Sequence, residues 1–499
     1  MTPGSRYLTP RPTPHVMRCL MRHLMHGAIV ATALFSTACD QFSPTEVRNP
    51  NVTNSAFLRT PDASRLWVKG VERTFLQTLN TLLVNTEIVS DNYFNNYTTQ
   101  SKVFDQPRID NQDLDVRSMF TDIARLRESA TYGIEVVLPA DTVARVRNEA
   151  DLLFYRAMGS IFVGEYFTGM PATALGPIVD AAGHLRLAID DLKRARTLYT
   201  DAALRNACTA ALARAYYRLG DRANATTEAT ALLAASPQFL RNATFDGVTG
   251  PSNSFQGLIT SATNNYQPMP RLDFLDPKYP NRGAQVQSPL ALLKAEEAHA
   301  ILAEAALATN DLTTARTRLK GLLTLVQQRP TELVDSRNQN RGRSGGIVIY
   351  PDSTDYRVAF APGAPFQTGF VLYRKGATVR VPTVSGTSVT AERIDQIDSV
   401  ADGYYVLYLM RQEIFLAEGR RSTDIGLRFP VPFAEAQVNT NLDMSAPYMT
   451  AVVPAFLPTN LGMDSFIMNT TARTVEIRND VNAILVANRT SPLIMPFKN

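Results

Sequence analysis

The chain has 499 residues, and 45% of them are hydrophobic, so it can bury one large core or two to three smaller ones. This composition excludes a disordered tail or a fibre. The formal net charge is +4, but Arg6, Arg11, Arg18 and Arg22 precede Cys39 and no acidic residue does. Without the first 38 residues, 46 basic residues face 46 acidic ones, and a nucleic-acid partner loses its electrostatic basis.

The first segment in chain order has the pattern of a secretory signal. Residues 17–38 combine a positive start, an apolar run around 27–35 and small residues directly before Cys39. An apolar run of about 10 residues is too short to span a bilayer, which takes about 20. We therefore expect a signal peptide over 1–38, with Met17 as the true start because the preceding stretch is rich in proline.

Cys39 is the expected first residue of the mature chain. The site resembles the lipobox of bacterial lipoproteins, where signal peptidase II cuts and the thiol carries a diacylglycerol, although Ser36 stands where that family prefers Leu. The alternative is an ordinary signal peptidase I site with a bystander cysteine. The resemblance implies lipid attachment at Cys39, an outer-membrane lipid partner and a tether over 39–60. We expect the other mature-chain cysteine, Cys208, to be buried in an alanine-rich helix.

The remaining chain predicts a mainly α fold built from helical hairpins. Leu212, Tyr216 and Leu219 recur at helical spacing before a turn at Gly220–Asp221, and a similar pattern surrounds Asn310–Asp311. We expect hairpins near 149–199, 207–239 and 289–329, preceded by helices over 62–90 and 115–138. These hairpins resemble tetratricopeptide repeats. The sequence thus predicts one large α-rich domain over 61–499.

Long irregular segments interrupt the hairpins at 242–288 and 331–390, where glycine, proline, asparagine and serine are frequent. Loops of this length are usually functional or disordered, and their aromatic residues favour ordered packing. We expect few short strands, at 346–350 and 369–381, and a last helix over 404–421. The segment 442–499 is treated as a C-terminal extension without an assigned fold.

The C-terminal motifs carry a family resemblance. Glu418, Gly419 and Arg420 end the last predicted helix, Phe429–Pro432 reads FPVP, and YFTGMP stands at 166–171. This order resembles the SusD/RagB family of outer-membrane nutrient-binding lipoproteins, with Ser422–Thr423 in place of the family's Trp-Phe pair. The resemblance implies four tetratricopeptide-like units that carry a ligand surface on long loops. It also implies a cell-surface protein that passes an oligosaccharide or peptide to a SusC-like TonB-dependent transporter.

The sequence shows none of the common catalytic motifs, including the P-loop, the nucleophile elbow and HExxH. We therefore expect no enzyme and no cofactor. Asp110, Asp113 and Asp115 could bind calcium, but acidic residues directly before a helix more often cap it. Only His184 and His299 follow Cys39, which excludes a multi-histidine metal site. We expect no metal.

A ligand site needs aromatic faces and planar polar groups if the ligand is a sugar. The segment after the first long helix offers both, and its candidates are Asp91, Asn92, Tyr93, Phe94, Asn96 and Tyr97. The alternative is that these aromatics plug the core while the asparagines form turns. Weaker candidates are Tyr266, Phe274 and Tyr279, and Trp67 is expected in the core or facing the transporter.

A second function remains open at this point. A periplasm-facing tetratricopeptide lipoprotein could scaffold envelope protein assembly by holding protein segments in a helical groove. The long loops and the terminal motifs favour the nutrient-binding hypothesis, because a pure scaffold would have short turns throughout.

Overall fold

The computed structural model describes residues 57–95, 102–141, 143, 145–260, 266–336, 349–374 and 376–497. The predicted leader, Cys39 and most of the tether lie outside these residues. Residues 1–60 and 61–499 form separate units, and all the elements below belong to the second. No helix among the described residues has the length and apolar character needed to cross a membrane.

Two long helices open the second unit. Helix α3 spans Ala63–Ile88 and α4 spans Leu114–Tyr132, which confirms both predicted helices. After α4 the chain widens into a π-helical turn, η2 (Gly133–Val137), and continues into the short α5 (Leu138–Ala140). The carboxylate of Asp113 accepts hydrogen bonds from the backbone N–H groups of Asp115 and Val116, so the predicted capping role is confirmed.

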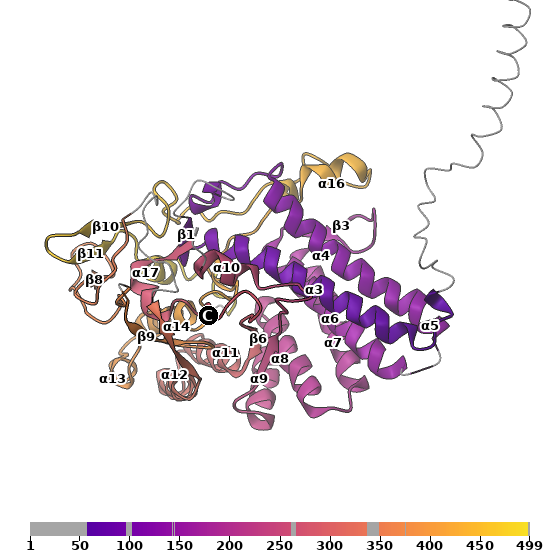
Figure 1. Ribbon diagram of the computed structural model, residues 1–499, viewed down its shortest axis with the longest axis horizontal. Helices are drawn as coiled ribbons and strands as arrows, with labels where there is room; N and C mark the ends of the chain where they lie inside the picture. The colour runs from indigo at the N-terminus through magenta and orange to yellow at the C-terminus, as the bar shows by residue number, and fades with distance from the viewer. Residues whose placement is uncertain are drawn as a thin grey trace, which may run out of the picture. The chain divides into compact units, whose positions relative to one another are not determined.

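Three helical hairpins follow and confirm the mainly α fold class (Figure 1). Their turns use the residues that the sequence indicated. Gly220 has a φ of 74°, and the Asp221 carboxylate caps the next helix through the N–H of Asn224. Asn310 and Asp311 act in the same way. The paired helices are α6 (Arg145–Tyr166) with α7 (Ala181–Leu198), α8 (Ala202–Arg218) with α9 (Arg222–Ala235), and α11 (Ala295–Leu307) with α12 (Leu312–Gln327).

Short strands, some in the two long inserted segments and some elsewhere, pair in twos. The segment 242–288 also holds α10 (Ser254–Thr260) and the 3₁₀ turn η3 (Pro270–Leu275). The antiparallel pairs are β1 (Tyr93–Asn95) with β5 (Tyr266–Pro268), β2 (Gly169–Pro171) with β3 (Ile178–Asp180), β4 (Leu240–Ala243) with β6 (Leu290–Lys294), and β7 (Thr331–Asp335) with β9 (Thr378–Pro382). The strand expected over 369–381 is thus confined to β9, and most of 346–350 lies outside the described residues.

The last predicted helix is shorter than expected. Helix α14 spans Val400–Ile414, because Ala417 and Gly419 adopt left-handed φ angles of 58° and 73° that a helix cannot continue through. Helix α14 follows α13 (Ala391–Asp395) and precedes α15 (Arg421–Asp424) and α16 (Phe433–Val438).

The C-terminal extension is folded into the same unit. It contains η5 (Pro447–Met449), β10 (Phe466–Asn469), β11 (Thr474–Ile477) and α17 (Val481–Ala487). Strand β11 pairs antiparallel with β10 and parallel with β8 (Arg357–Ala359), so the extension and the second inserted segment build one three-stranded sheet.

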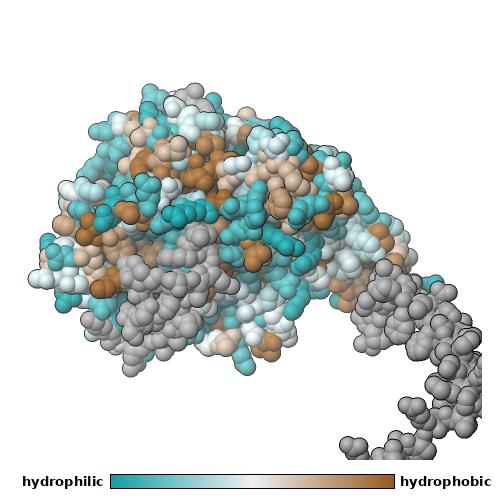
Figure 2. Space-filling model, turned by 90° about the horizontal axis from the view of Figure 1, so that it is seen from above, coloured by the Kyte–Doolittle hydropathy of each residue, from teal (hydrophilic) through white to brown (hydrophobic). Residues whose placement is uncertain are grey.

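One large cluster of buried side chains runs through the helices and the inserted segments. Phe255 and Tyr279 of the first insertion are fully buried, which confirms its ordered packing, and Cys208 is buried as expected. Hydrophobic and hydrophilic residues are interspersed over the face seen from above (Figure 2).

Candidate functional site

The Glu-Gly-Arg motif lies in the core and joins distant parts of the chain. Glu418 Oε1 accepts hydrogen bonds from the Nζ atoms of Lys278 and Lys294, the latter at 2.6 Å. The N–H of Gly419 donates to Glu87 Oε1 at 2.6 Å. All these side chains are buried, so each charge depends on its partner for stabilisation.

Arg421 extends this network to the end of α3. Its Nε and Nη2 atoms donate to the two oxygens of Asp91 at 2.5 and 2.9 Å. Gln412 Nε2 donates to Asp91 and to Asn92. Burial by itself would raise the pKa of Asp91, but the charge and hydrogen bonds of Arg421 lower it below its ordinary value.

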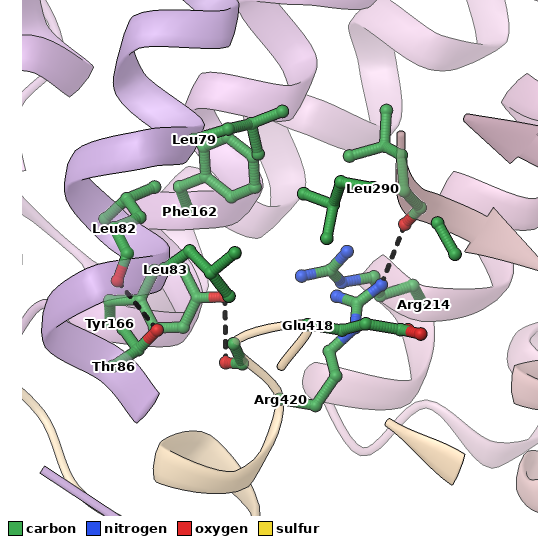
Figure 3. Close-up of a pocket in the computed structure, with 13 residues that line it drawn as sticks. Leu79, Leu82, Leu83, Thr86, Phe162, Tyr166, Arg214, Leu290, Glu418 and Arg420 are labelled. Carbon is green, nitrogen blue, oxygen red and sulfur yellow. Dashed lines mark hydrogen bonds between the residues drawn. The ribbon is translucent and has the colours of Figure 1, made fainter. Parts of the chain in front are cut away.

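A small internal cavity lies beside the motif (Figure 3). Its volume is about 20 Å³, and leucines of α3, Phe162, Tyr166 and the Glu418–Arg420 stretch line it. This volume holds about one water molecule, so no sugar or peptide can enter, and the motif therefore has a structural role.

Burial also affects two charged partners of the motif. It raises the pKa of Glu87 to about 7 and lowers the pKa of Lys278 to about 8.

The structure corrects the expectation that Tyr93 and Phe94 present exposed rings. Tyr93 is fully buried and its hydroxyl donates to Asp276 Oδ1 at 2.7 Å, while Phe94 is 6% exposed. Asp91 and Asn92 are also buried in the network around Arg421. The sequence reasoning failed because the high polar density serves a buried hydrogen-bond network. Asn96 and Tyr97, the other two candidates, lie outside the described residues.

The weaker candidates also lie in or against the core. Tyr266 and Tyr279 are buried, and the Tyr279 hydroxyl donates to the carbonyl of Ala417 at 2.6 Å. Phe274 is half-buried against Phe370, with ring centroids 5.6 Å apart. Trp67 is half-buried, and its Nε1 donates to the carbonyl of Ser129. Tyr266 and Tyr279 therefore offer no exposed ring to a sugar.

An open groove of about 460 Å³ lies beside the three-stranded sheet, and we call it the loop-end groove. Nine residues from the second inserted segment and the C-terminal extension line it. They are Pro362, Pro458, Asn460, Leu461, Ser465, Ile467, Glu476, Arg478 and Asn479. Its volume falls within the range of small-molecule sites, roughly 300–1,000 Å³.

Strand alternation gives the β10–β11 pair two different faces, one toward the groove and one toward the core. Ile467 lies opposite Glu476 in the β10–β11 pair, and both side chains point outward into the groove. Their neighbours Phe466, Val475 and Ile477 point to the other face of the sheet, where Val475 and Ile477 are fully buried.

An aromatic cluster ties the groove to the predicted ligand segment. Phe466 lies 5.8 Å from Phe94 and 6.4 Å from Tyr350, measured between ring centroids. The Asn95 N–H donates to Asp105 Oδ1 at 3.0 Å, so the chain on both sides of 96–101 meets at one point. A Cβ on Gly462 would lie 3.2 Å from the Asp105 carbonyl, so the groove borders that same point.

Asp273 holds both ends of the segment 350–374, which contains the groove residue Pro362. This fully buried carboxylate accepts hydrogen bonds from the N–H of Leu372 at 2.8 Å and from Arg374 Nη2 at 2.7 Å. The Tyr350 hydroxyl also donates to it, at 3.3 Å. The 266–279 segment thus supports the groove from within, although its aromatic residues were predicted to bind ligand directly.

The groove combines the groups that recognise hydroxyls with an apolar floor. Glu476 accepts a hydrogen bond from the N–H of Gly363 through Oε2, and the exposed Arg478 supplies guanidinium donors. Asn460 and Asn479 contribute amides, while Leu461 and Ile467 are 66% and 46% exposed. These residues were not predicted, although the alternation of polar and apolar residues in TVEI was a readable signal of a two-faced strand.

A second open hollow of about 430 Å³ lies between α7 and the C-terminal segment. Arg428 is one of its lining residues, and Nη1 of Arg428 donates to the backbone carbonyls of Gly164 and Phe167. Burial lowers the pKa of Arg428 to about 10. Because this guanidinium is committed to backbone carbonyls, the hollow is a weaker site for a polar ligand than the loop-end groove.

Comparison with known proteins identifies the fold. The chain matches a SusD superfamily protein from Parabacteroides distasonis with a TM-score of 0.50 and 10% identity, over 76% of this chain and 98% of that one. It also resembles a SusD-like carbohydrate binding protein from Bacteroides vulgatus, with a TM-score of 0.48 and 14% identity over 72% and 82% of the two chains. No family model matches the sequence, and no curated protein matches it.

Proposed function

With the SusD-superfamily fold as the premise, we propose that the chain binds a nutrient, most simply an oligosaccharide, at the loop-end groove. The observation that carries the proposal is the groove's lining: a carboxylate, a guanidinium and two amides around exposed aliphatic side chains. Such a set can hydrogen-bond hydroxyls and cover the apolar face of a sugar ring.

The proposed role is binding without chemistry. Among the nine described residues that line the groove, Glu476 is the one carboxylate, whereas glycoside hydrolysis ordinarily uses two. The groove also opens to solvent beside the point where the 96–101 segment begins and ends, so Asn96 and Tyr97 stay proposed ligand contacts. Their neighbours Asp91 and Asn92 instead support the segment through Gln412.

We further propose a cell-surface lipoprotein, attached to the outer membrane through a lipid on Cys39, that passes its ligand to a SusC-like TonB-dependent transporter. This part rests on the leader and on the sequence resemblance. Protease treatment of intact cells tests it, and complete protection of the chain would favour the periplasmic scaffold. Mass spectrometry of the N-terminal peptide tests the lipid, and affinity purification from membranes tests the transporter.

The binding site has a matched test. We expect the double variant Glu476→Gln, Arg478→Gln to lose binding on an array of defined neutral and acidic oligosaccharides, because it removes both charged groups of the groove. The control is Lys320→Gln, Asp395→Asn, which removes an exposed ion pair of α12 and α13. Equal binding by the double variant and the parent would rule out this groove. Binding of a random tripeptide pool in place of sugars would change the ligand class and keep the site.

A further inference from the structure

Three segments meet at the end of the second unit where the chain enters it. The N–H of Ser64, in the first turn of α3, donates to Asp141 Oδ2 at 2.8 Å. Asn148, in the first turns of α6, donates to Ser64 Oγ at 2.6 Å, and the N–H of Val143 donates to Asp141 Oδ1. Figure 1 accordingly shows α5 and the start of α3 at the same end of the molecule.

Large apolar side chains are exposed around this junction. Leu66 is 44% exposed, Val136 37%, Val143 48% and Val146 57%. None of them belongs to the loop-end groove. Exposed aliphatic side chains gathered at one end of a protein mark an interaction surface more often than scattered ones do.

Two aromatic residues with polar groups accompany the aliphatic side chains. Trp67 and Tyr132 lie with ring centroids 5.0 Å apart, and Tyr132 is 37% exposed. Trp and Tyr are favoured where an apolar phase meets water, because each has an apolar ring and a hydrogen-bonding group. We call this surface the anchor end, and it consists of Leu66, Trp67, Tyr132, Val136, Val143 and Val146.

The covalent chain limits how far this surface can be from the proposed lipid. Cys39 and Pro61 are 22 residues apart, so even a fully extended tether reaches at most about 75 Å. Asp62 directly precedes α3, and Leu66 and Trp67 lie in the first turns of that helix. A lipid on Cys39 would therefore hold the anchor end at high local concentration near a bilayer.

We propose that the anchor end docks on the lipid surface of the membrane that holds the anchor. The aliphatic side chains enter the boundary between headgroups and acyl chains, and Trp67 and Tyr132 lie at headgroup level. This inference rests on the proposed lipid attachment. Two of the basic residues at this end are paired with acidic ones, Arg65 with Asp62 and Lys69 with Glu72.

Trp67 gives a specific readout because it is the chain's one tryptophan. The experiment uses the full lipidated chain in phosphatidylethanolamine–phosphatidylglycerol vesicles that contain brominated phosphatidylcholine, which quenches nearby tryptophan. The test variant is Leu66→Gln, Val136→Gln, Val146→Gln. The matched control is Leu114→Gln, Val248→Gln, Val438→Gln, which makes the same changes at residues that are 73%, 72% and 66% exposed elsewhere.

We expect strong quenching of Trp67 in the parent and the control, and its loss in the test variant. The same chain with Cys39→Ser should partition onto the vesicles, and the test variant should weaken that partition about tenfold, because part of each aliphatic surface no longer leaves water. A lipidated chain that floats with the vesicles while Trp67 stays unquenched would overturn docking and leave the lipoprotein proposal intact. If the chain carries no lipid, the anchor proposal fails, and the partition of the unlipidated chain still decides whether this surface docks.

Discussion

The hairpin helices α6–α9, α11 and α12, which we call the helical scaffold, are built from contacts between neighbours in the sequence. The loop end, formed by β1, β5, β8, β10 and β11, includes strand pairs whose partners are more than a hundred residues apart. In the scaffold, Gly220 and Asp221 alone turn one helix into the next. At the loop end, a strand from the second insertion needs a strand from the C-terminal extension. Side chains on the groove face can therefore vary without disturbing the scaffold.

The largest effect should come from the buried network in which Arg421 joins α15 to Asp91, between α3 and β1. Arg421→Ala leaves the carboxylate of Asp91 buried without its guanidinium, and we expect it to lower the free energy of unfolding by about 3–5 kcal/mol. Chemical denaturation measures this change. Arg147→Ala is the control, because the Arg147 side chain in its pair with Asp151 is 55% exposed and such pairs are worth about 1 kcal/mol or less.

A double variant distinguishes the cost of an unpaired buried charge from general misfolding. Asp91→Asn with Arg421→Gln removes both charges, so it should cost less than Arg421→Ala alone. If Arg421→Ala is as mild as Arg147→Ala, the buried Asp91 carboxylate does not depend on Arg421 for its stabilisation.

The scaffold should show a pH dependence that centres on His184. This histidine is fully buried, and its Nε2 lies 2.8 Å from the carbonyl of Met170. Burial lowers the pKa of His184 to about 4, from an ordinary 6.5. Between these values the unfolded chain binds a proton that the folded chain does not, so stability falls as the pH falls from 6.5 to 4. The total loss should be about 3 kcal/mol.

Denaturation curves at pH 7, 5.5 and 4.5 measure this effect, and His184→Gln should remove that part of the pH dependence. An unchanged slope in the variant would place the titrating group elsewhere.

The sequence predicted the scaffold well because its signals are local. Helical spacing, Gly220 and the caps at Asp221 and Asp311 each act within a few residues, and all were readable. The end of α14 was missed because Ala417, whose carbonyl accepts a hydrogen bond from the remote Tyr279, adopts a left-handed conformation that alanine seldom takes. The groove was missed because Glu476 and Pro362 become neighbours only through the pairing of β8 with β11. The burial of Asp91 and Tyr93 was not readable for the same reason, since their partners Arg421 and Asp276 are remote in the sequence.

A smaller effect is expected at the scaffold turns. Asp311 Oδ1 accepts a hydrogen bond from the N–H of Thr314 at 2.9 Å and caps α12. Asp311→Ala should lower the free energy of unfolding by about 1 kcal/mol, whereas Asp311→Asn should be nearly neutral because asparagine caps equally well. Thermal unfolding of both variants measures the difference. Equal losses in the two would indicate that the charge, and not the cap, matters.

The smallest effect on stability should come from the groove itself, where Ile467→Ala truncates a side chain that is 46% exposed. We expect a change within about 0.5 kcal/mol in the free energy of unfolding. Ile477→Ala, on the buried face of the same sheet, should cost about 2–5 kcal/mol. If Ile467→Ala weakens sugar binding while its unfolding curve overlays that of the parent, the outer face of the sheet serves the ligand and the inner face serves the fold. Equal destabilisation by the two variants would mean that Ile467 belongs to the core, and the groove would then lose its apolar floor.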